Sequence, residues 1–202
     1  MTLAKITFSV FKRDFLLSIL NLSTSIAIGR KLGLEALGIW AILRMISNYI
    51  EAFGRTKSDQ TLVYFIGRNR LSIADALANI NFILLVNLSL LGLILTLNNT
   101  FIYNLFLAKS ESNYINHFYM VLFSLPFSFI LTSYSYFFQA IQDYKTYNRI
   151  LTIETFLHSI IAIILIYFSQ LGLWSIIISY FVSPIIALIF AFQKLPKNIF
   201  LQ

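Results

Sequence analysis

Long apolar segments separated by short polar ones dominate the pattern of this 202-residue chain. A membrane-spanning helix needs about 20 predominantly apolar residues, and several segments reach that length. The pattern predicts spans near 8–29, 35–54, 76–98, 114–141, 147–169 and 171–193. We therefore expect an all-α polytopic membrane protein, with about six transmembrane helices forming one membrane lobe over 1–202.

Two segments depart from a plain apolar run. Lys12, Arg13 and Asp14 interrupt the first predicted span, so its membrane part is expected to begin near Phe15. Residues 60–73 are amphipathic, which predicts a helix lying along the membrane surface before the third span.

Composition supports the membrane class. The chain is 58% hydrophobic and only 11% charged, with 20 phenylalanines, which lies outside the usual composition of a soluble domain. It has no cysteine, so disulfides and thiolate metal sites are excluded.

The basic residues predict an orientation. With six spans, one side of the membrane carries eleven of them: Lys5, Lys12, Arg13, Arg55, Lys57, Arg68, Arg70, Lys145, Arg149, Lys194 and Lys197. The other side carries Arg30, Lys31 and Lys109, and Arg44 lies within a span. By the positive-inside rule, both termini are expected to be cytoplasmic. Because these charges are spread over several short loops, nucleic acid is not an expected partner.

The second predicted span carries a polar stripe. Arg44 and Glu51 are seven residues apart, which returns them to the same helix face, and Ser47 and Asn48 lie between them. Charged residues inside a membrane usually face a protein interior or a wet cavity. The alternative is an Arg44–Glu51 ion pair that only fixes packing.

The first and fifth spans offer similar polar edges. In the first, Asp14, Ser18, Asn21 and Ser25 follow a 4-3-4 spacing, and in the fifth, Glu154 and His158 are an i, i+4 pair whose side chains can touch. Three such edges would suit a bundle lining a hydrophilic cavity. The alternatives are interhelical hydrogen bonds for Ser18, Asn21 and Ser25, and an interfacial role for Glu154 and His158.

Signatures of enzymes, cofactors and metals are not found in the sequence. There is no phosphate-cradling glycine loop, no His/Glu metal cluster and no nucleophile elbow. We therefore expect a protein that is not an enzyme and that needs no cofactor or metal.

The turn between the first two predicted spans is the most distinctive motif. It reads Gly-Arg-Lys-Leu-Gly-Leu-Glu-Ala-Leu-Gly-Ile-Trp over 29–40, with Arg30, Gly33, Glu35 and Gly38 at its key positions. It resembles the helix 1–2 junction of polysaccharide flippases in the multidrug/oligosaccharidyl-lipid/polysaccharide exporter superfamily. The segments 62–68 and 138–145 are similar to that family's amphipathic segment before helix three and its turn after helix four.

The resemblance implies a function and a location. Members usually have two six- or seven-helix lobes, and this chain corresponds to the first lobe alone, so a truncated or half-size form that associates with itself or with a second lobe is expected. The implied activity is the flipping of polyprenyl-diphosphate-linked oligosaccharides across the bacterial inner membrane, for surface polysaccharide or O-antigen assembly.

Candidate residues for that activity follow from the polar edges. Arg44 is the first candidate for binding the carrier diphosphate, because guanidinium binds phosphate oxygens in a fork, and Arg30 is the second. The residues expected to line the sugar path or support the arginines are Asp14, Asn21, Glu51, Glu154 and His158. Two alternatives remain: a cation-coupled drug exporter of the same superfamily, and a membrane scaffold subunit of a glycan-assembly complex.

Overall fold

Six long helices make up most of the protein. The computed structural model describes residues 3–54, 63–66, 73–107 and 114–195. The helices are α1 (Leu3–Lys31), α2 (Gly33–Gly54), α4 (Ile73–Leu107), α5 (Ile115–Ala140), α6 (Tyr144–Phe168) and α7 (Trp174–Gln193), with a short helical turn at 63–66. The prediction of an all-helical fold is thus confirmed for the residues described, which include no strand.

Three of these helices are long and apolar enough to cross a membrane, namely α5, α6 and α7. This is the composition of a helical membrane protein; the full set of six spans stays a prediction. The helices extend beyond the predicted spans at some ends, since α1 begins at Leu3 and α4 continues to Leu107. Of the predicted surface segment, 60–62 and 67–72 lie outside the described residues, and the turn at 63–66 buries Ile66.

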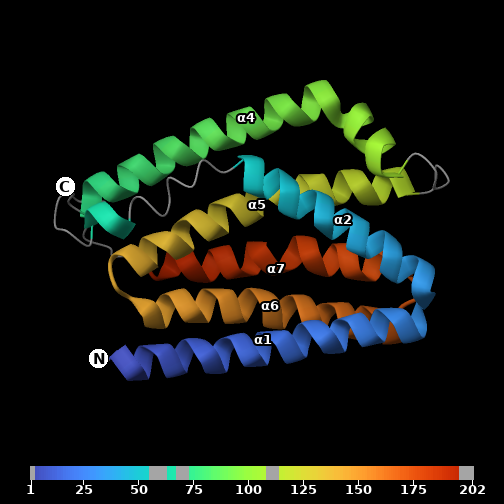
Figure 1. Cartoon of the computed structure of the whole chain (residues 1–202), viewed down its shortest axis with the longest axis horizontal. Helices are drawn as coiled ribbons and strands as arrows, with labels where there is room; N and C mark the ends of the chain where they lie inside the picture. The colour runs from blue at the N-terminus through green and yellow to red at the C-terminus, as the bar shows by residue number, and fades with distance from the viewer. Residues whose placement is uncertain (1–2, 55–62, 67–72, 108–113, 196–202) are drawn as a thin grey trace.

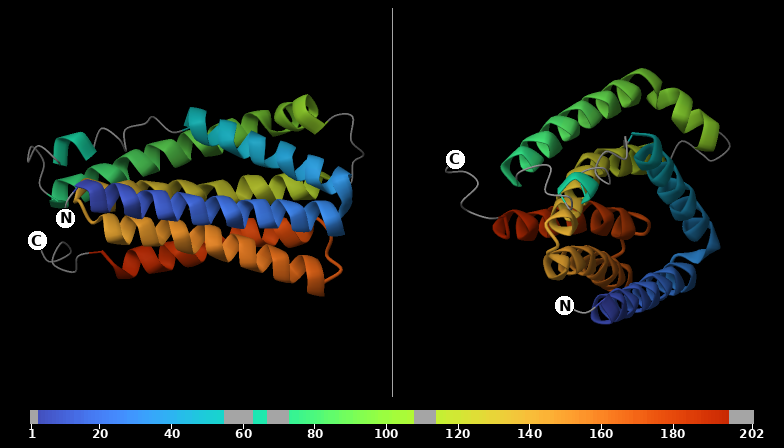
Figure 2. Two further views of the ribbon diagram at one scale, coloured as in Figure 1. Left: turned by 60° about the horizontal axis from the view of Figure 1, so that its bottom comes forward. Right: turned by 60° about the vertical axis from the view of Figure 1, so that its left-hand side comes forward.

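α5, α6 and α7 pack against one another, and α1, α2 and α4 lie around these three helices (Figures 1 and 2). α6 packs against both α1 and α7, while α5 packs against both α7 and α4. α1 begins, and α7 ends, at the same end of the bundle (Figure 2). Lys12, Arg13, Lys145, Arg149 and Lys194 belong to that end, whereas Arg30 and Lys31 close α1 at the other. Arg55, Lys57, Arg68, Arg70, Lys109 and Lys197 lie outside the described residues.

A tight turn at Gly33 sets the course of α2. Gly33 has a φ of +91°, a conformation that L side chains rarely adopt. No atom would obstruct a Cβ there, so the requirement for glycine is conformational. After this turn α2 runs obliquely across the bundle from α1 toward α5 and α4 (Figure 1).

Small side chains on α7 let its neighbours approach closely. Every fourth residue is a serine or alanine and is at most 2% exposed: Ser175, Ser179, Ser183, Ala187 and Ala191. Small residues at this spacing allow membrane helices to pack backbone to backbone. Ala187 and Ala191 share a buried cluster with Phe137 of α5 and Ile150 of α6, so the stripe joins all three helices that form the centre of the fold.

Candidate functional site

Four of the predicted site residues converge on one region between α2, α6 and α7. Arg44 and Glu51 come from one face of α2, and Glu154 and His158 come from one face of α6. All but His158 interact electrostatically with Tyr180 of α7, whose ring lies beside that of His158. We call this the α2–α6–α7 cluster, and its members are Arg44, Ser47, Glu51, Glu154, His158, Ser179 and Tyr180.

Three aromatic rings hold the cluster together. Trp40 of α2 has its ring centroid 6.0 Å from that of His158 and 5.4 Å from that of Tyr180. The His158 and Tyr180 centroids are 5.9 Å apart, with their rings edge to face. Trp40 is only 5% exposed, so these contacts tie the oblique helix α2 to α6 and α7.

The hydrogen bonds of His158 define its tautomer. Its Nδ1 lies 3.0 Å from the Ser179 Oγ, and that hydroxyl donates to the Ile176 carbonyl at 2.7 Å. A serine hydroxyl has one proton to donate and a carbonyl can only accept. The Nδ1 of His158 therefore carries a proton and donates it to Ser179, which leaves Nε2 as the acceptor of the neutral ring.

Tyr180 connects the aromatic and charged parts of the cluster. Its hydroxyl lies near Ser47, which is fully buried, and near the charged side chains of Glu51, Glu154 and Arg44. Arg44 also acts electrostatically on His158, and its side chain is exposed. The cluster thus presents an accessible guanidinium beside hydroxyl, imidazole and carboxylate groups, which is a chemistry suited to a polar or anionic ligand.

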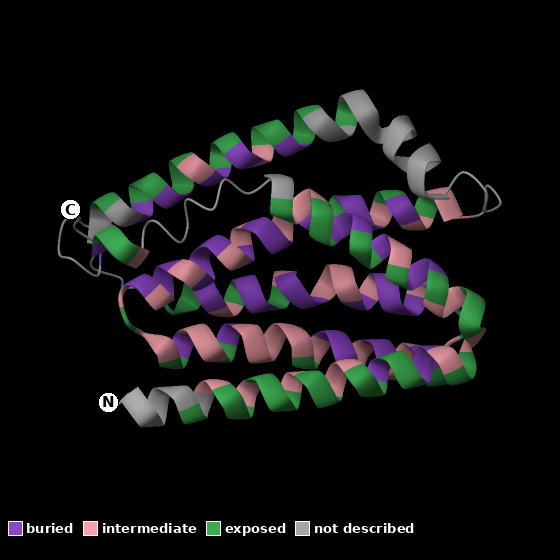
Figure 3. Cartoon of the chain, viewed as in Figure 1, coloured by how far each residue is buried: buried purple, intermediate pink, exposed green. Residues whose placement is uncertain are grey.

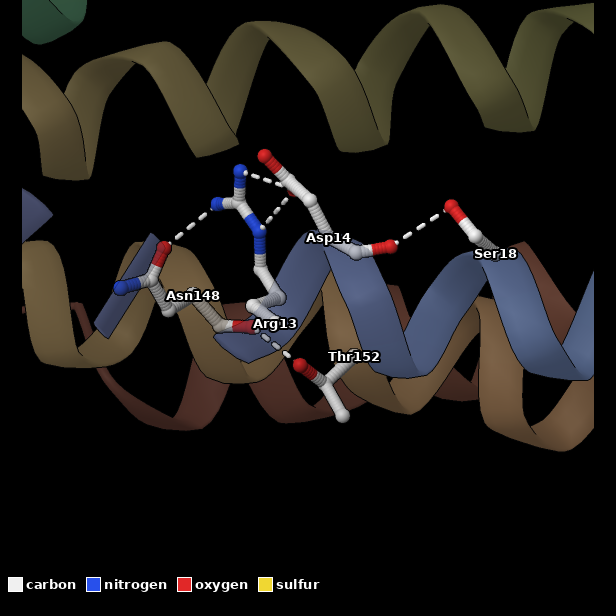
Figure 4. A network of polar contacts seen from close by, with 5 residues as sticks. All are labelled: Arg13, Asp14, Ser18, Asn148 and Thr152. Atoms are coloured by element: carbon white, nitrogen blue, oxygen red, sulfur yellow. Dashed lines mark hydrogen bonds and ion pairs between the residues drawn. The ribbon is translucent and has the colours of Figure 1, made fainter. Parts of the chain in front are cut away.

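Asp14 belongs to a different network, at the α1–α6 contact (Figure 4). Arg13 donates from Nε and from one terminal nitrogen to the Asp14 Oδ1, at 2.9 and 2.8 Å, and from the other to Asn148. The guanidinium also lies over the Tyr147 ring, 5.5 Å from its centroid. The carboxylate of Asp14 is thus paired within α1, and this network joins α1 to the first turns of α6.

The polar stripe of α1 is exposed along most of its length (Figure 3). Ser18 and Ser25 donate to carbonyls of their own helix, those of Asp14 at 2.8 Å and Asn21 at 3.0 Å. These two hydroxyls therefore do not serve the interhelical bonds considered as an alternative. Asn21 is half-buried, and Arg30 is exposed at the far end of α1, roughly 24 Å from Asp14 along the helix. The structure does not bring Asp14, Asn21 or Arg30 into the α2–α6–α7 cluster.

Sequence reasoning did not find Tyr180 and Ser179. The spacing of Ser175, Ser179 and Ser183 signals only a packing stripe, and Tyr180 is one of 11 tyrosines in an aromatic-rich chain. In the part of the chain that the structure describes, no group of three or more histidine or acidic side chains is placed to hold a metal ion.

Comparison with known proteins gives no relative for this chain. No family model matches it, and neither the curated proteins nor the solved structures include a match.

Proposed function

We propose that the protein flips lipid-linked oligosaccharide repeat units across the bacterial inner membrane, for surface polysaccharide or O-antigen assembly. In this proposal the 202 residues form one lobe, both termini of that lobe are cytoplasmic, and a second lobe completes the cavity. The observation that carries the proposal is the convergence of Arg44, Glu51, Glu154 and His158 on one cluster between otherwise apolar helices.

The chemistry of the cargo explains why these groups are suitable. A polyprenyl diphosphate needs a cation, and the exposed Arg44 can bind two phosphate oxygens in a fork. Sugar hydroxyls need donors and acceptors, which the hydroxyl of Tyr180 and the Nε2 of His158 would provide. Glu51 and Glu154 would accept from further hydroxyls or orient Arg44.

The exposed stripe of α1 would supply a second polar wall. Ser18 and Ser25 satisfy their hydroxyl protons within the helix, so their oxygens keep acceptor capacity for water or sugar. Asp14, Asn21 and Arg30 would lie along the same path, with Arg30 at its outer end. Alternating access would then require this lobe to rock against its partner.

The test is complementation of a bacterium that lacks its own repeat-unit flippase and makes the matching repeat unit. Expression of the 202-residue chain should restore surface glycan, and R44A should lose it while R44K retains part. K31A is the matched control, because Lys31 is an exposed cation at the end of α1. Full export by R44A, with membrane insertion verified by blot, would exclude Arg44 as the diphosphate ligand.

The two carboxylates of the cluster favour a second candidate, a cation-coupled drug exporter. The carboxylates of Glu51 and Glu154 both lie near Tyr180. A cavity lined by these two acidic groups would suit a cationic drug. The same strain separates the candidates: resistance to toxic cations that depends on Glu51 and Glu154, without restored glycan, would identify the exporter.

A further inference from the structure

The end of the bundle where α1 begins carries several exposed cations. Lys12 of α1 and Lys145 and Arg149 of α6 are all exposed. We call these three residues the basic edge. None of them forms an ion pair within the described part of the chain.

The three residues lie at one level along the α1–α6 pair. Arg13 contacts both Tyr147 and Asn148, so Lys12 and Arg149 are the chain neighbours of residues in direct contact. Lys145 lies one helical turn before Arg149 and on the same face of α6.

The nearby carboxylates are already engaged. Asp14 accepts both bonds from Arg13, and Asp143 caps α6 by accepting from the Thr146 amide at 3.1 Å. Together with Arg13, the basic edge places four cations beside these two carboxylates. The described residues there therefore have an excess of positive charge, reinforced by the positive end of the α6 dipole.

Exposed aromatic rings flank the basic edge. Phe8, Phe11 and Phe15 are 58%, 64% and 61% exposed, and the Lys12 ammonium lies 4.7 Å from the Phe8 ring centroid. Apolar rings beside cations are typical of segments at a membrane surface, where the rings enter the acyl region and the cations meet headgroups.

We propose that the basic edge binds the phosphate groups of anionic bilayer phospholipids. Lys145 and Arg149 make the headgroup contact and Lys12 adds to it, while the phenylalanines insert beside the acyl chains. This site is separate from the α2–α6–α7 cluster, and it would hold α1 and α6 in register with one leaflet whatever the cargo.

The test measures the thermal unfolding of the detergent-solubilised full chain, followed by the fluorescence of its two tryptophans. Soluble short-chain phosphatidylglycerol should raise the unfolding temperature, whereas the phosphatidylcholine of equal chain length should not. Each basic residue near an anionic surface strengthens binding about fivefold, so K145Q/R149Q should need roughly thirtyfold more phosphatidylglycerol for the same shift.

The control is K31Q, which removes one exposed cation from the other end of α1 and should respond as the unaltered chain does. Added salt should reduce the phosphatidylglycerol effect, because exposed charges are screened. Single variants K145Q and R149Q, each expected to need about fivefold more lipid, provide the measurement if the double variant does not fold. An equal response of K145Q/R149Q and the unaltered chain, or the same shift from inorganic phosphate alone, would overturn the proposal.

Discussion

The Nδ1 of His158 and the Oγ of Ser179 lie 3.0 Å apart in the interior of the bundle. Because Ser179 is fully buried and His158 is 9% exposed, S179A would leave the imidazole N–H without its acceptor. We expect S179A to lower the free energy of unfolding by about 1–3 kcal/mol, measured by denaturation in mixed micelles.

Ser175 provides the control for this prediction. It is one turn away on the same buried stripe, and its hydroxyl has no hydrogen-bond partner among the residues described. S175A should therefore be neutral or slightly stabilising. Nitrogen NMR of the protein, which has two histidines, should find His158 protonated at Nδ1; protonation at Nε2 alone would contradict the assignment.

Arg13 connects α1 to α6 through two contacts and also pairs with Asp14 within α1. R13A removes the bond to Asn148, the contact with the Tyr147 ring and the pair with Asp14. Each contact contributes about 0.5–1 kcal/mol at a partly exposed site, so we expect a loss of about 1–2 kcal/mol in the free energy of unfolding.

R13A should also destabilise one part of the fold, the first half of α1, more than the rest. In R13A, hydrogen exchange should accelerate in the first half of α1, whereas K12A should leave exchange nearly unchanged, because Lys12 contacts Phe8 of its own helix. Equal hydrogen exchange in R13A and K12A would show that Arg13 does not stabilise the packing of α1 against α6.

The two exposed faces of α1 should differ in their contact with water. Since the chain has no cysteine, single cysteines can be introduced without background labelling. We expect S18C and S25C to react with a membrane-impermeant thiol reagent in open membranes and I19C, at a site 49% exposed on another face of the helix, to be at least tenfold slower.

This difference would arise because thiols react as thiolates, which form in water rather than in lipid. Equal, slow labelling at all three positions would mean that the polar stripe faces no aqueous space. That result would remove α1 from the proposed cargo path without affecting the α2–α6–α7 cluster.

Ala187 should tolerate no larger side chain. It is fully buried where α7 meets α5 and α6, so A187L should cost about 1–3 kcal/mol through overpacking. I189L is the matched control two residues away, because Ile189 is 54% exposed. The unfolding temperature of the purified protein should fall in A187L and stay unchanged in I189L.

Sequence periodicity predicted the faces of the helices well and their neighbours poorly. The seven-residue separation of Arg44 and Glu51 and the four-residue separation of Glu154 and His158 follow from helix geometry. The placement of these pairs around Tyr180 depends on the oblique course of α2, which hydropathy does not encode. Asp14 illustrates the opposite error: its spacing places it in a polar stripe, but its partner is the adjacent Arg13, itself held by a residue 135 positions away.

The turn at Gly33 leaves α2 anchored at one end and held farther along by side chains. The contacts of Trp40 with His158 and Tyr180 are therefore the first to change if α2 swings away from α6 and α7. The other tryptophan, Trp174, has its ring 4.3 Å from that of His117 of α5, outside the path of such a swing. Intrinsic fluorescence can therefore follow the motion of this helix: the emission of Trp40 reports the position of α2, and that of Trp174 provides the reference.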